Sequence, residues 1–236
     1  MELGKTLEQL FVWDKEVVSR FPELSLGIGI VREVKVEKTN RKIEELRKQV
    51  FEEVRRLYKT EVLKDNPTVR AYRDLYWSLG IDPTKTRPSG EALLRRVLRG
   101  DEIPNISNVV DAYNLASLKT IIPMSGFDLD AITPPLHIRF SKENDVFQGI
   151  GAQAPTKLEN KVLVLSDKTG IVCIYPYRDA DATKIMDKTR NILLIGYGAP
   201  KITPNRLLEA VELALTYVNE VSGGKIERKE VFSSTF

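Results

Sequence analysis

Apolar side chains recur every three or four residues in several stretches of the chain, and most residues between them are charged or polar. This spacing places the apolar positions on one face of an α-helix, which packs against a core. Some stretches also carry end signals: Asn66-Pro67 and Pro88-Ser89 suit a first turn, and Gly80 and Gly100 suit a stop. The pattern predicts helices over residues 7–20, 40–58, 66–80, 88–100, 109–118 and 204–221.

A different pattern follows the central helix, with short β-rich runs separated by turn residues. Residues 167–170 predict a hairpin turn, and Gly27 and Gly29 in an earlier run indicate a bulge or a close backbone approach. A helical first half feeding a sheet predicts an α+β fold, with helices packed on a mixed, mainly antiparallel sheet. Strands are expected over residues 24–36, 121–122, 137–140, 162–165, 171–175 and 191–197, and a last strand or tail over 225–232.

Composition narrows the classes of protein. The 236 residues can bury a substantial core, and a net charge of +3 does not by itself argue for nucleic acid. Cys173 is the only cysteine, so a disulfide within the chain and a cysteine-rich zinc site are excluded. His137, the only histidine, stands at the start of an expected strand, where we expect a structural or surface residue rather than the base of a Ser-His-Asp relay. We expect no metal or other cofactor. Without a signal-peptide pattern or an apolar run of about 18 residues, a cytoplasmic protein outside the membrane is expected, with its oligomeric state left open.

The most basic part of the chain lies between residues 55 and 99. Tyr72, Tyr76 and Trp77 are interleaved with its cations, as in surfaces that meet phosphates and unstacked bases. The alternative is a solvated helical face whose charges pair with each other, for example Glu91 with Arg95. The first interpretation predicts RNA-binding roles for Arg70, Arg73, Arg96 and Arg99.

The central predicted helix carries polar residues that are unusual for a packing helix. Asp111, Asn114, Ser117 and Lys119 stand beside an apolar set with neighbours at three- and four-residue spacing. A buried Asp, Asn or Ser needs hydrogen-bond partners or costs roughly 1–3 kcal/mol. The helix therefore predicts a polar site at the edge of a core, in which Asp111 is buried and holds the loop that follows.

Three motifs carry a resemblance to a known family. Asn108-Val109-Val110-Asp111, Asn114, Leu118, Pro123 and Phe127-Asp128-Leu129-Asp130 resemble, in order and spacing, the B3/B4 domain of the bacterial phenylalanyl-tRNA synthetase β subunit. That module hydrolyses wrongly charged tRNA. Residues 87–96 are similar to the R-P-S-x-E-x-L-L-R-R signature of its stand-alone relatives, and residues 178–183 to their R-D/Q-x-x-x-T element. The resemblance covers roughly residues 65–200 and implies a single B3/B4-like domain over 1–236, with 1–64 a family-variable extension packed on it.

The resemblance also implies a site. Tyr113, Asn114 and Ser125 match a Thr, an Asn and a His that line the synthetase editing pocket, and Lys184 matches a Glu that recognises the hydroxyl of misattached tyrosine. Of these four positions, Asn114 alone is retained. We expect Asn114 and Arg178 to act in catalysis. Substrate contacts are expected from Tyr113, Ser117, Ser125, Asp128, Arg139, Thr183 and Lys184, and support of the pocket from Arg87, Glu91, Arg95, Asp111 and Asp130.

Two functions follow as expectations. The first is hydrolysis of a misacylated tRNA in trans, in which a water held by Asn114, main-chain groups and the substrate's ribose hydroxyl attacks the ester while Arg178 or backbone N–H groups stabilise the oxyanion. The second is a non-catalytic module that binds tRNA, an amino acid or a related metabolite. In a purely structural interpretation, Asp128 and Asp130 cap a turn and Arg139 pairs with one of them.

Overall fold

The structure is a computed structural model, and it describes residues 7–234. The α-helices are α1 (Leu7–Leu10), α2 (Lys15–Arg20), α3 (Arg41–Leu57), α4 (Pro67–Ser78), α5 (Ser89–Leu98), α6 (Asn108–Thr120) and α7 (Pro204–Ser222). The strands are β1 (Phe11–Trp13), β2 (Ser25–Arg32), β3 (Met124–Asp128), β4 (Leu136–Phe140), β5 (Val146–Phe147), β6 (Thr156–Lys157), β7 (Leu163–Ser166), β8 (Ile171–Ile174), β9 (Arg178–Asp179), β10 (Ile192–Tyr197) and β11 (Lys225–Ser233). Short 3-10 turns η1 (Leu63–Asp65), η2 (Leu129–Ala131) and η3 (Asp181–Thr183) complete the described order.

The strands form sheets that are mainly antiparallel. One has the order β11-β2-β10-β3 and is antiparallel throughout, and a second has the order β1-β4-β7-β8-β9. Within the second, β1 and β4 run parallel and the other neighbours antiparallel. The small pair β5-β6 stands apart. The predicted α+β class with a mixed, mainly antiparallel sheet is therefore confirmed.

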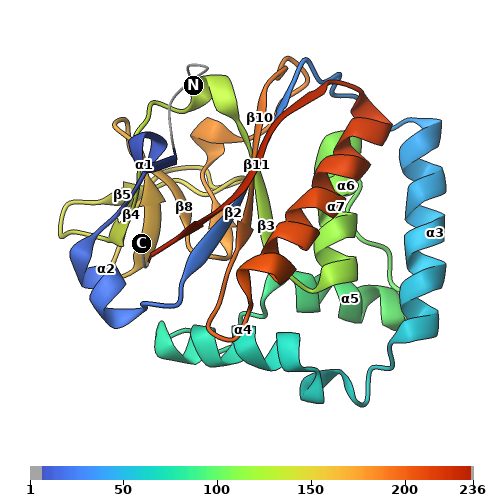
Figure 1. The fold of residues 1–236 in the computed structure, drawn as a ribbon, viewed down its shortest axis with the longest axis horizontal. Coiled ribbons are helices and arrows are strands. Elements are labelled where there is room, and N and C mark those ends of the chain that lie inside the picture. Colours follow the sequence, from blue (N-terminus) through green and yellow to red (C-terminus); the bar gives the residue numbers. More distant parts are fainter. Residues whose placement is uncertain (1–6, 235–236) are drawn as a thin grey trace.

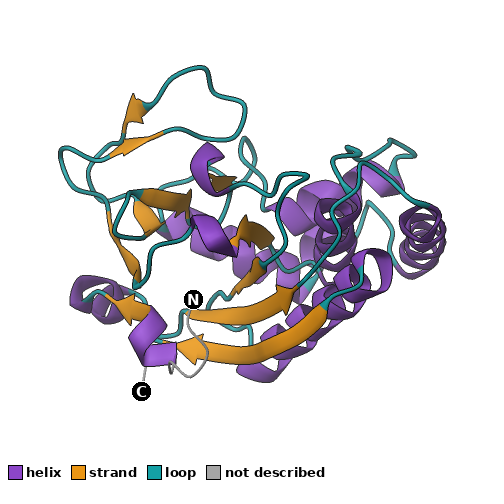
Figure 2. Ribbon diagram, turned by 90° about the horizontal axis from the view of Figure 1, so that it is seen from above, coloured by secondary structure: helices purple, strands orange, loops and turns teal. Residues whose placement is uncertain are grey.

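The helices and sheets form layers. Figure 1 shows α6 and α7 beside the β11-β2-β10-β3 sheet with α3 outside them, and Figure 2 shows most helices gathered on one side of the molecule. The close approach of α7 requires glycine in β2, because a Cβ at Gly27 would lie 2.6 Å from the Cγ2 of Val211. The prediction of a close backbone approach at these glycines is confirmed. The second sheet joins the same core, since Tyr175, after β8, packs edge-on against Tyr197 of β10 with ring centroids 4.9 Å apart.

Local signals explain where most helices begin. The side chains of Asn40, Asn66, Ser107 and Thr203 accept hydrogen bonds from the first turns of α3, α4, α6 and α7, so each helix has its N-terminal N–H groups partly satisfied. Residues before 65 also supply β2, which lies inside its sheet between β11 and β10. Within the described residues, no helix combines the length and the apolar character that a membrane span requires.

Two predicted elements differ from the structure. Residues 7–20 are not one helix: the chain extends at Phe11–Trp13 to pair with β4 before α2 begins. The strand expected at 121–122 starts instead at Met124, because α6 continues to Thr120 and Ile121 takes a left-handed conformation with φ of 64°. The predicted hairpin at 167–170 is confirmed, since β7 and β8 pair and Asp167 accepts hydrogen bonds from Thr169 and Gly170.

Candidate functional site

A cavity of about 290 Å³ opens between α6, β3 and the segments around β9 and η3. Its polar wall comes from Tyr113, Asn114, Ser125, Tyr177, Asp179 and Lys184. Its apolar wall includes Ile106, Val110, Met124, Ile150 and Ile185. The cavity has the mixed lining of a small-molecule site, with a few convergent polar groups on an apolar surface.

The helix α6 presents Tyr113 and Asn114 to this cavity. Tyr113 is buried and lies on Gly126 of β3, where a Cβ would come within 2.6 Å of the Cε1 of the ring. Asn114 is half-buried, and no hydrogen bond to its side chain is found in the part of the chain that the structure describes. Its amide is therefore available to a ligand or a water.

Ser125 and Asp179 meet across the cavity wall from β3 and β9. The Ser125 hydroxyl donates to Oδ1 of Asp179 over 2.7 Å. Burial raises the pKa of Asp179 to about 6, although the Ser125 hydrogen bond and the charge of Arg178 both act to lower it. Burial, followed by the nearby Asp179 charge, also raises the pKa of the Tyr113 hydroxyl. This wall therefore carries a carboxylate that is costly to ionise.

Lys184 occupies another part of the lining. An isolated β-bridge to Phe127 of β3 holds its backbone, and its Nζ lies 2.7 Å from Oδ1 of Asp181. The ammonium is thus neutralised by a carboxylate of its own turn. Lys184 faces the cavity as one half of an ion pair.

Arg178 does not border the cavity. Successive residues of a strand point to opposite faces, so Asp179 faces the cavity while Arg178 turns away. The Arg178 guanidinium donates to the carbonyl oxygen of Ile150 over 2.8 Å, and a Cβ at Gly149 would lie 2.5 Å from its Nε. Arg178 therefore clamps the loop that brings Ile150 to the rim.

Five further residues expected at the substrate or in support of the pocket lie outside the lining. Ser117 donates to the carbonyl oxygen of Ile122 and holds the turn after α6. Arg139 lies on β4 and binds Asp145 over 2.6 Å rather than Asp128 or Asp130, because the register of its sheet carries it away from them. The remaining three are Asp128, which caps the η2 turn through the Asp130 N–H and accepts from Thr189; Asp130, which accepts from Asn191; and Thr183, whose buried hydroxyl has no partner among the described residues.

Glu91 organises the segment before α6. Its buried carboxylate accepts two hydrogen bonds from the Arg73 guanidinium, over 2.5 and 2.8 Å, and one from the Arg95 Nε, over 2.6 Å. Burial on its own would raise the pKa of Glu91, but these hydrogen bonds outweigh it and the pKa is lowered. Arg73 thus fastens α4 to α5, whereas the Arg95 bond lies within α5. Arg87, by contrast, is exposed and has no ion pair among the described residues.

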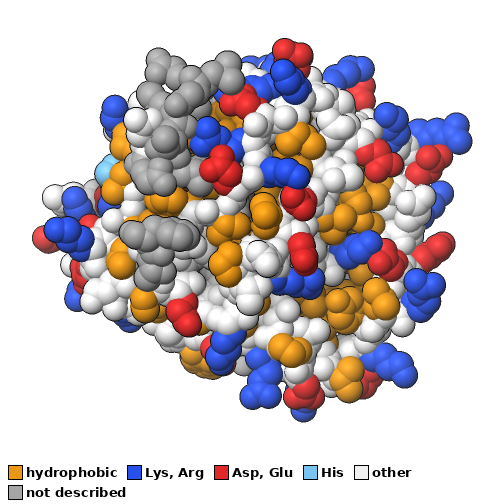
Figure 3. Space-filling model, in the orientation of Figure 1, with side chains coloured by type: hydrophobic (Ala, Val, Ile, Leu, Met, Phe, Trp, Pro, Cys, Tyr) orange, Lys and Arg blue, Asp and Glu red, His pale blue; other side chains and the backbone are white. Residues whose placement is uncertain are grey.

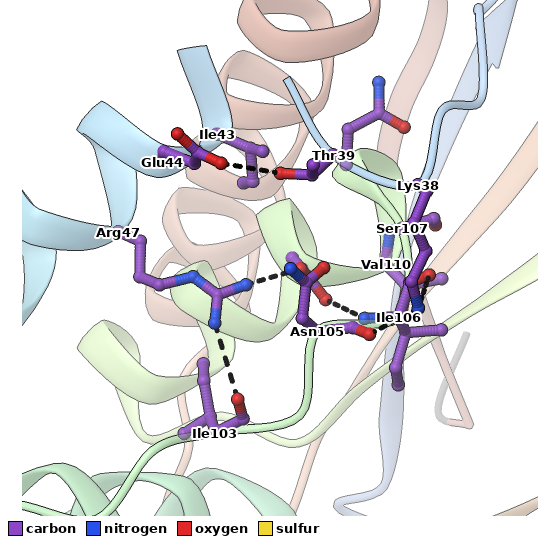
Figure 4. A network of polar contacts seen from close by, with 12 residues as sticks. Lys38, Thr39, Ile43, Glu44, Arg47, Ile103, Asn105, Ile106, Ser107 and Val110 are labelled. Carbon is purple, nitrogen blue, oxygen red and sulfur yellow. Dashed lines mark hydrogen bonds and ion pairs between the residues drawn. The ribbon is translucent and has the colours of Figure 1, made fainter. Parts of the chain in front are cut away.

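Asp111 holds the loop before α6, not the loop after it as expected. Its buried carboxylate accepts from Nη2 of Arg47 over 2.5 Å and from the Ile106 N–H over 3.0 Å. Figure 4 shows Arg47 reaching from α3 toward this loop and also toward the Ile103 carbonyl. Burial raises the pKa of Asp111, although the hydrogen bond from Ile106 and the charge of Arg47 both act to lower it. The correction has a simple cause, since Asp111 lies in the first turn of α6. The network fixes Ile106, which borders the cavity.

Three of the four arginines expected to bind RNA, namely Arg73, Arg96 and Arg99, are engaged with neighbours. Arg96 donates to the carbonyl of Glu102, and Arg99 pairs with Asp101 over 3.2 Å. Arg70 is exposed and borders a depression of about 590 Å³ with Lys201 and Arg206. Figure 3 shows cationic and anionic side chains interspersed over one face of the molecule. These contacts agree with a face of paired charges around Arg73, Arg95 and Arg99.

Among residues 7–234, no cluster of His, Cys, Asp and Glu suits a metal ion. Cys173 is buried with its Sγ 3.1 Å from the Tyr197 hydroxyl, and burial raises the pKa of its thiol.

Asp179 and Tyr177 were not predicted from the sequence as lining residues of the cavity. The R-D-x-x-x-T element contains Asp179, but the catalytic role in this element was predicted for Arg178, which lies outside the cavity lining.

Comparisons with known proteins agree on one family. The family model described as the B3/4 domain matches residues 71–223. Among curated proteins, the phenylalanine–tRNA ligase beta subunit of Neisseria meningitidis serogroup B is 28% identical over 123 residues, which is 52% of this chain and 16% of that protein. The corresponding subunit of Fusobacterium nucleatum is 26% identical over 191 residues, which is 80% of this chain and 23% of that protein.

The chain thus spans about a fifth of the length of these curated relatives. Among solved structures, an N-terminal fragment of the phenylalanyl-tRNA synthetase beta subunit from Pyrococcus horikoshii matches with a TM-score of 0.49 and 13% identity, covering 95% of this chain and 52% of that fragment. Assignment of the family rests on the match to residues 71–223, which is more than half of the chain. The chain belongs to the B3/4 domain family.

Proposed function

We propose that this protein hydrolyses the ester bond of a misacylated tRNA in trans, with the cavity as the aminoacyl pocket. One observation carries the proposal. Tyr113, Asn114 and Ser125, whose counterparts line the editing pocket of the synthetase domain that the chain resembles, border one cavity here. A volume of about 290 Å³ suits an aminoacyl group.

The chemistry asks little of side chains, because an aminoacyl ester is already activated. A water positioned by the free Asn114 amide and main-chain groups attacks the carbonyl carbon. The ester C–O bond then breaks, and the water's proton reaches the departing ribose oxygen. Since Arg178 is bound to the Ile150 carbonyl, backbone N–H groups are the better donors for the oxyanion, and Arg178 acts by fixing the rim.

A panel of misacylated tRNAs incubated with the purified protein tests the proposal through loss of the ester. Acceleration over buffer for at least one pairing is expected, and none for any pairing refutes hydrolysis. Asn114→Ala should slow the reaction at least about tenfold, because the water loses its positioning. The free energy of unfolding should change by less than about 0.5 kcal/mol, since the amide has no protein partner. Asn205→Ala, an exposed asparagine of α7, is the matched control.

The non-catalytic alternative is favoured by one feature. Lys184 stands where the synthetase domain has its tyrosine-recognising Glu, and it is bound to Asp181, so the cavity lacks that recognition group. Thermal stabilisation by one free amino acid without ester loss would support an amino-acid-binding module. Salt-dependent tRNA binding without deacylation would support an RNA-binding module.

A further inference from the structure

A carboxylate on the cavity wall has no cation of its own. Oδ1 of Asp179 accepts one hydrogen bond, from Ser125 over 2.7 Å. Within residues 7–234, no ion pair and no second hydrogen bond to this carboxylate is found. The cation next to it in sequence, Arg178, is turned to the Ile150 carbonyl. Asp179 therefore keeps acceptor capacity that faces the cavity.

The other charged group of the lining cannot neutralise Asp179. Lys184 is paired with Asp181 over 2.7 Å, and Asn114 and Tyr177 are neutral. Met124, Val110 and Ile185 make much of the remaining wall apolar. A carboxylate in such surroundings is costly until a donor, preferably a cation, binds it. The raised pKa of Asp179 is a second sign of this cost, caused first by burial.

We propose that Asp179, held in place by Ser125, binds the protonated α-amino group of an aminoacyl ligand whose apolar side chain packs on the walls of the cavity. The inference rests on the proposed function only in placing an aminoacyl group in this cavity. An α-ammonium supplies the positive charge and the N–H donors that the carboxylate lacks. The apolar wall cannot supply either, and it suits an aliphatic or aromatic side chain instead.

A pair of small probes tests the inference without tRNA. L-leucine amide carries the α-ammonium and an apolar side chain, whereas N-acetyl-L-leucine amide keeps the side chain and loses the charge. Titration calorimetry at neutral pH should detect binding of the first and not of the second. Asp179→Asn should weaken binding of L-leucine amide at least about tenfold, as expected for loss of a charge-assisted hydrogen bond.

The matched control is Asp187→Asn, which removes the same charge at an exposed position outside the cavity lining. It should leave the affinity within about twofold, because an exposed charge is screened by solvent. Unfolding curves of both variants confirm that each is folded. Equal affinity of wild type and Asp179→Asn, equal binding of the two probes, or no binding of L-leucine amide at millimolar concentration would overturn the inference.

The inference and the hydrolase proposal fail in different ways. If misacylated tRNA is hydrolysed and Asp179→Asn leaves both kcat and KM unchanged, hydrolysis stands and the role of Asp179 is refuted. If no tRNA is deacylated but L-leucine amide binds and Asp179→Asn abolishes that binding, the role of Asp179 stands and hydrolysis is refuted.

Discussion

Two carboxylates in this chain have opposite surroundings. Glu91 lies inside the helical region and receives hydrogen bonds from two guanidinium groups, so its pKa is lowered despite burial. Asp179 lies at the cavity wall with one hydroxyl as its partner, and burial raises its pKa to about 6. Where the protein has neutralised a carboxylate, the contact holds helices together. Where it has not, the charge remains available to a ligand. Binding sites often contain groups that lower the stability of the fold but serve function in this way.

The two carboxylates also change the stability of the fold in opposite directions as pH rises. Glu91 adds stability above its ordinary pKa of 4.5, and that contribution is lost as pH falls through the lowered value. Asp179 binds its proton more tightly in the folded state, so it lowers stability as pH rises from its ordinary value of 3.8 through about 6. At neutral pH one carboxylate stabilises the fold and the other opposes it.

The largest effect is expected at Glu91. Glu91→Gln leaves Arg73 and Arg95 facing a neutral amide, so the free energy of unfolding at neutral pH should fall by about 3 kcal/mol. This is the lower end of the range for a broken buried ion pair, because the side chains of both arginines are partly exposed to solvent. Urea unfolding measures the change. Glu45→Gln is the control, since the Glu45 pair with Arg41 is exposed and should contribute less than about 1 kcal/mol. Similar losses for the two variants would contradict the structural role of Glu91.

Asp111 is the next test, because it is buried like Glu91 but bears a raised pKa. Asp111→Ala strands the Ile106 N–H and Arg47, and the free energy of unfolding should fall by about 1–3 kcal/mol. Amide hydrogen exchange should rise at Ile106, since the loop loses its anchor. Equal unfolding midpoints for wild type and variant would refute the assignment.

Asp179 should respond in the opposite direction. Asp179→Asn removes a charge that the folded protein opposes, so the free energy of unfolding at neutral pH should rise by about 1–2 kcal/mol, less than the full pKa shift implies because the cavity meets solvent. The gain should disappear below the ordinary pKa of 3.8, where wild type is protonated in both states. Chemical unfolding at several pH values measures it. A gain independent of pH, or a loss at neutral pH, would contradict the assignment.

Periodicity predicted the elements that repeat their burial over several turns or that carry their own end signals. The helix α3 buries Ile43, Leu46 and Val50 at the expected spacing and begins after the Asn40 cap. Periodicity failed where residues distant in sequence determine the local conformation. Phe11–Trp13 reads as part of a helix, but its backbone pairs with β4, which lies far along the chain. Two-residue strands such as β9 are too short to leave an alternation in the sequence.

The same limit applies to the site. The resemblance located Tyr113 and Asn114, which both border the cavity, and the polar positions of the central helix pointed independently to Asn114. It could not separate Arg178 from Asp179, since only the pairing of β9 with β8 determines which of the two faces the cavity. The i,i+4 spacing did allow the pair of Glu91 with Arg95 to be anticipated, but it could not show that Arg73 also binds Glu91, because Arg73 comes from another helix, α4.

The smallest effect is expected on α5, whose first residue, Ser89, borders the cavity and whose far end carries Arg99. Arg87 is exposed two residues before Ser89, which borders the cavity, and has no ion pair in the described chain. Arg99 is paired with Asp101 and lies roughly 15 Å from Ser89, since a helix rises about 1.5 Å per residue.

If a tRNA end enters the cavity, Arg87→Ala should flatten the log–log salt dependence of tRNA binding by about 0.7–0.9, the value of one phosphate contact, and Arg99→Ala should not. Filter binding over a salt series measures both slopes. Equal slopes for the two variants would exclude Arg87 from the path of the RNA, and a change at Arg99 alone would move that path to the far end of the helix.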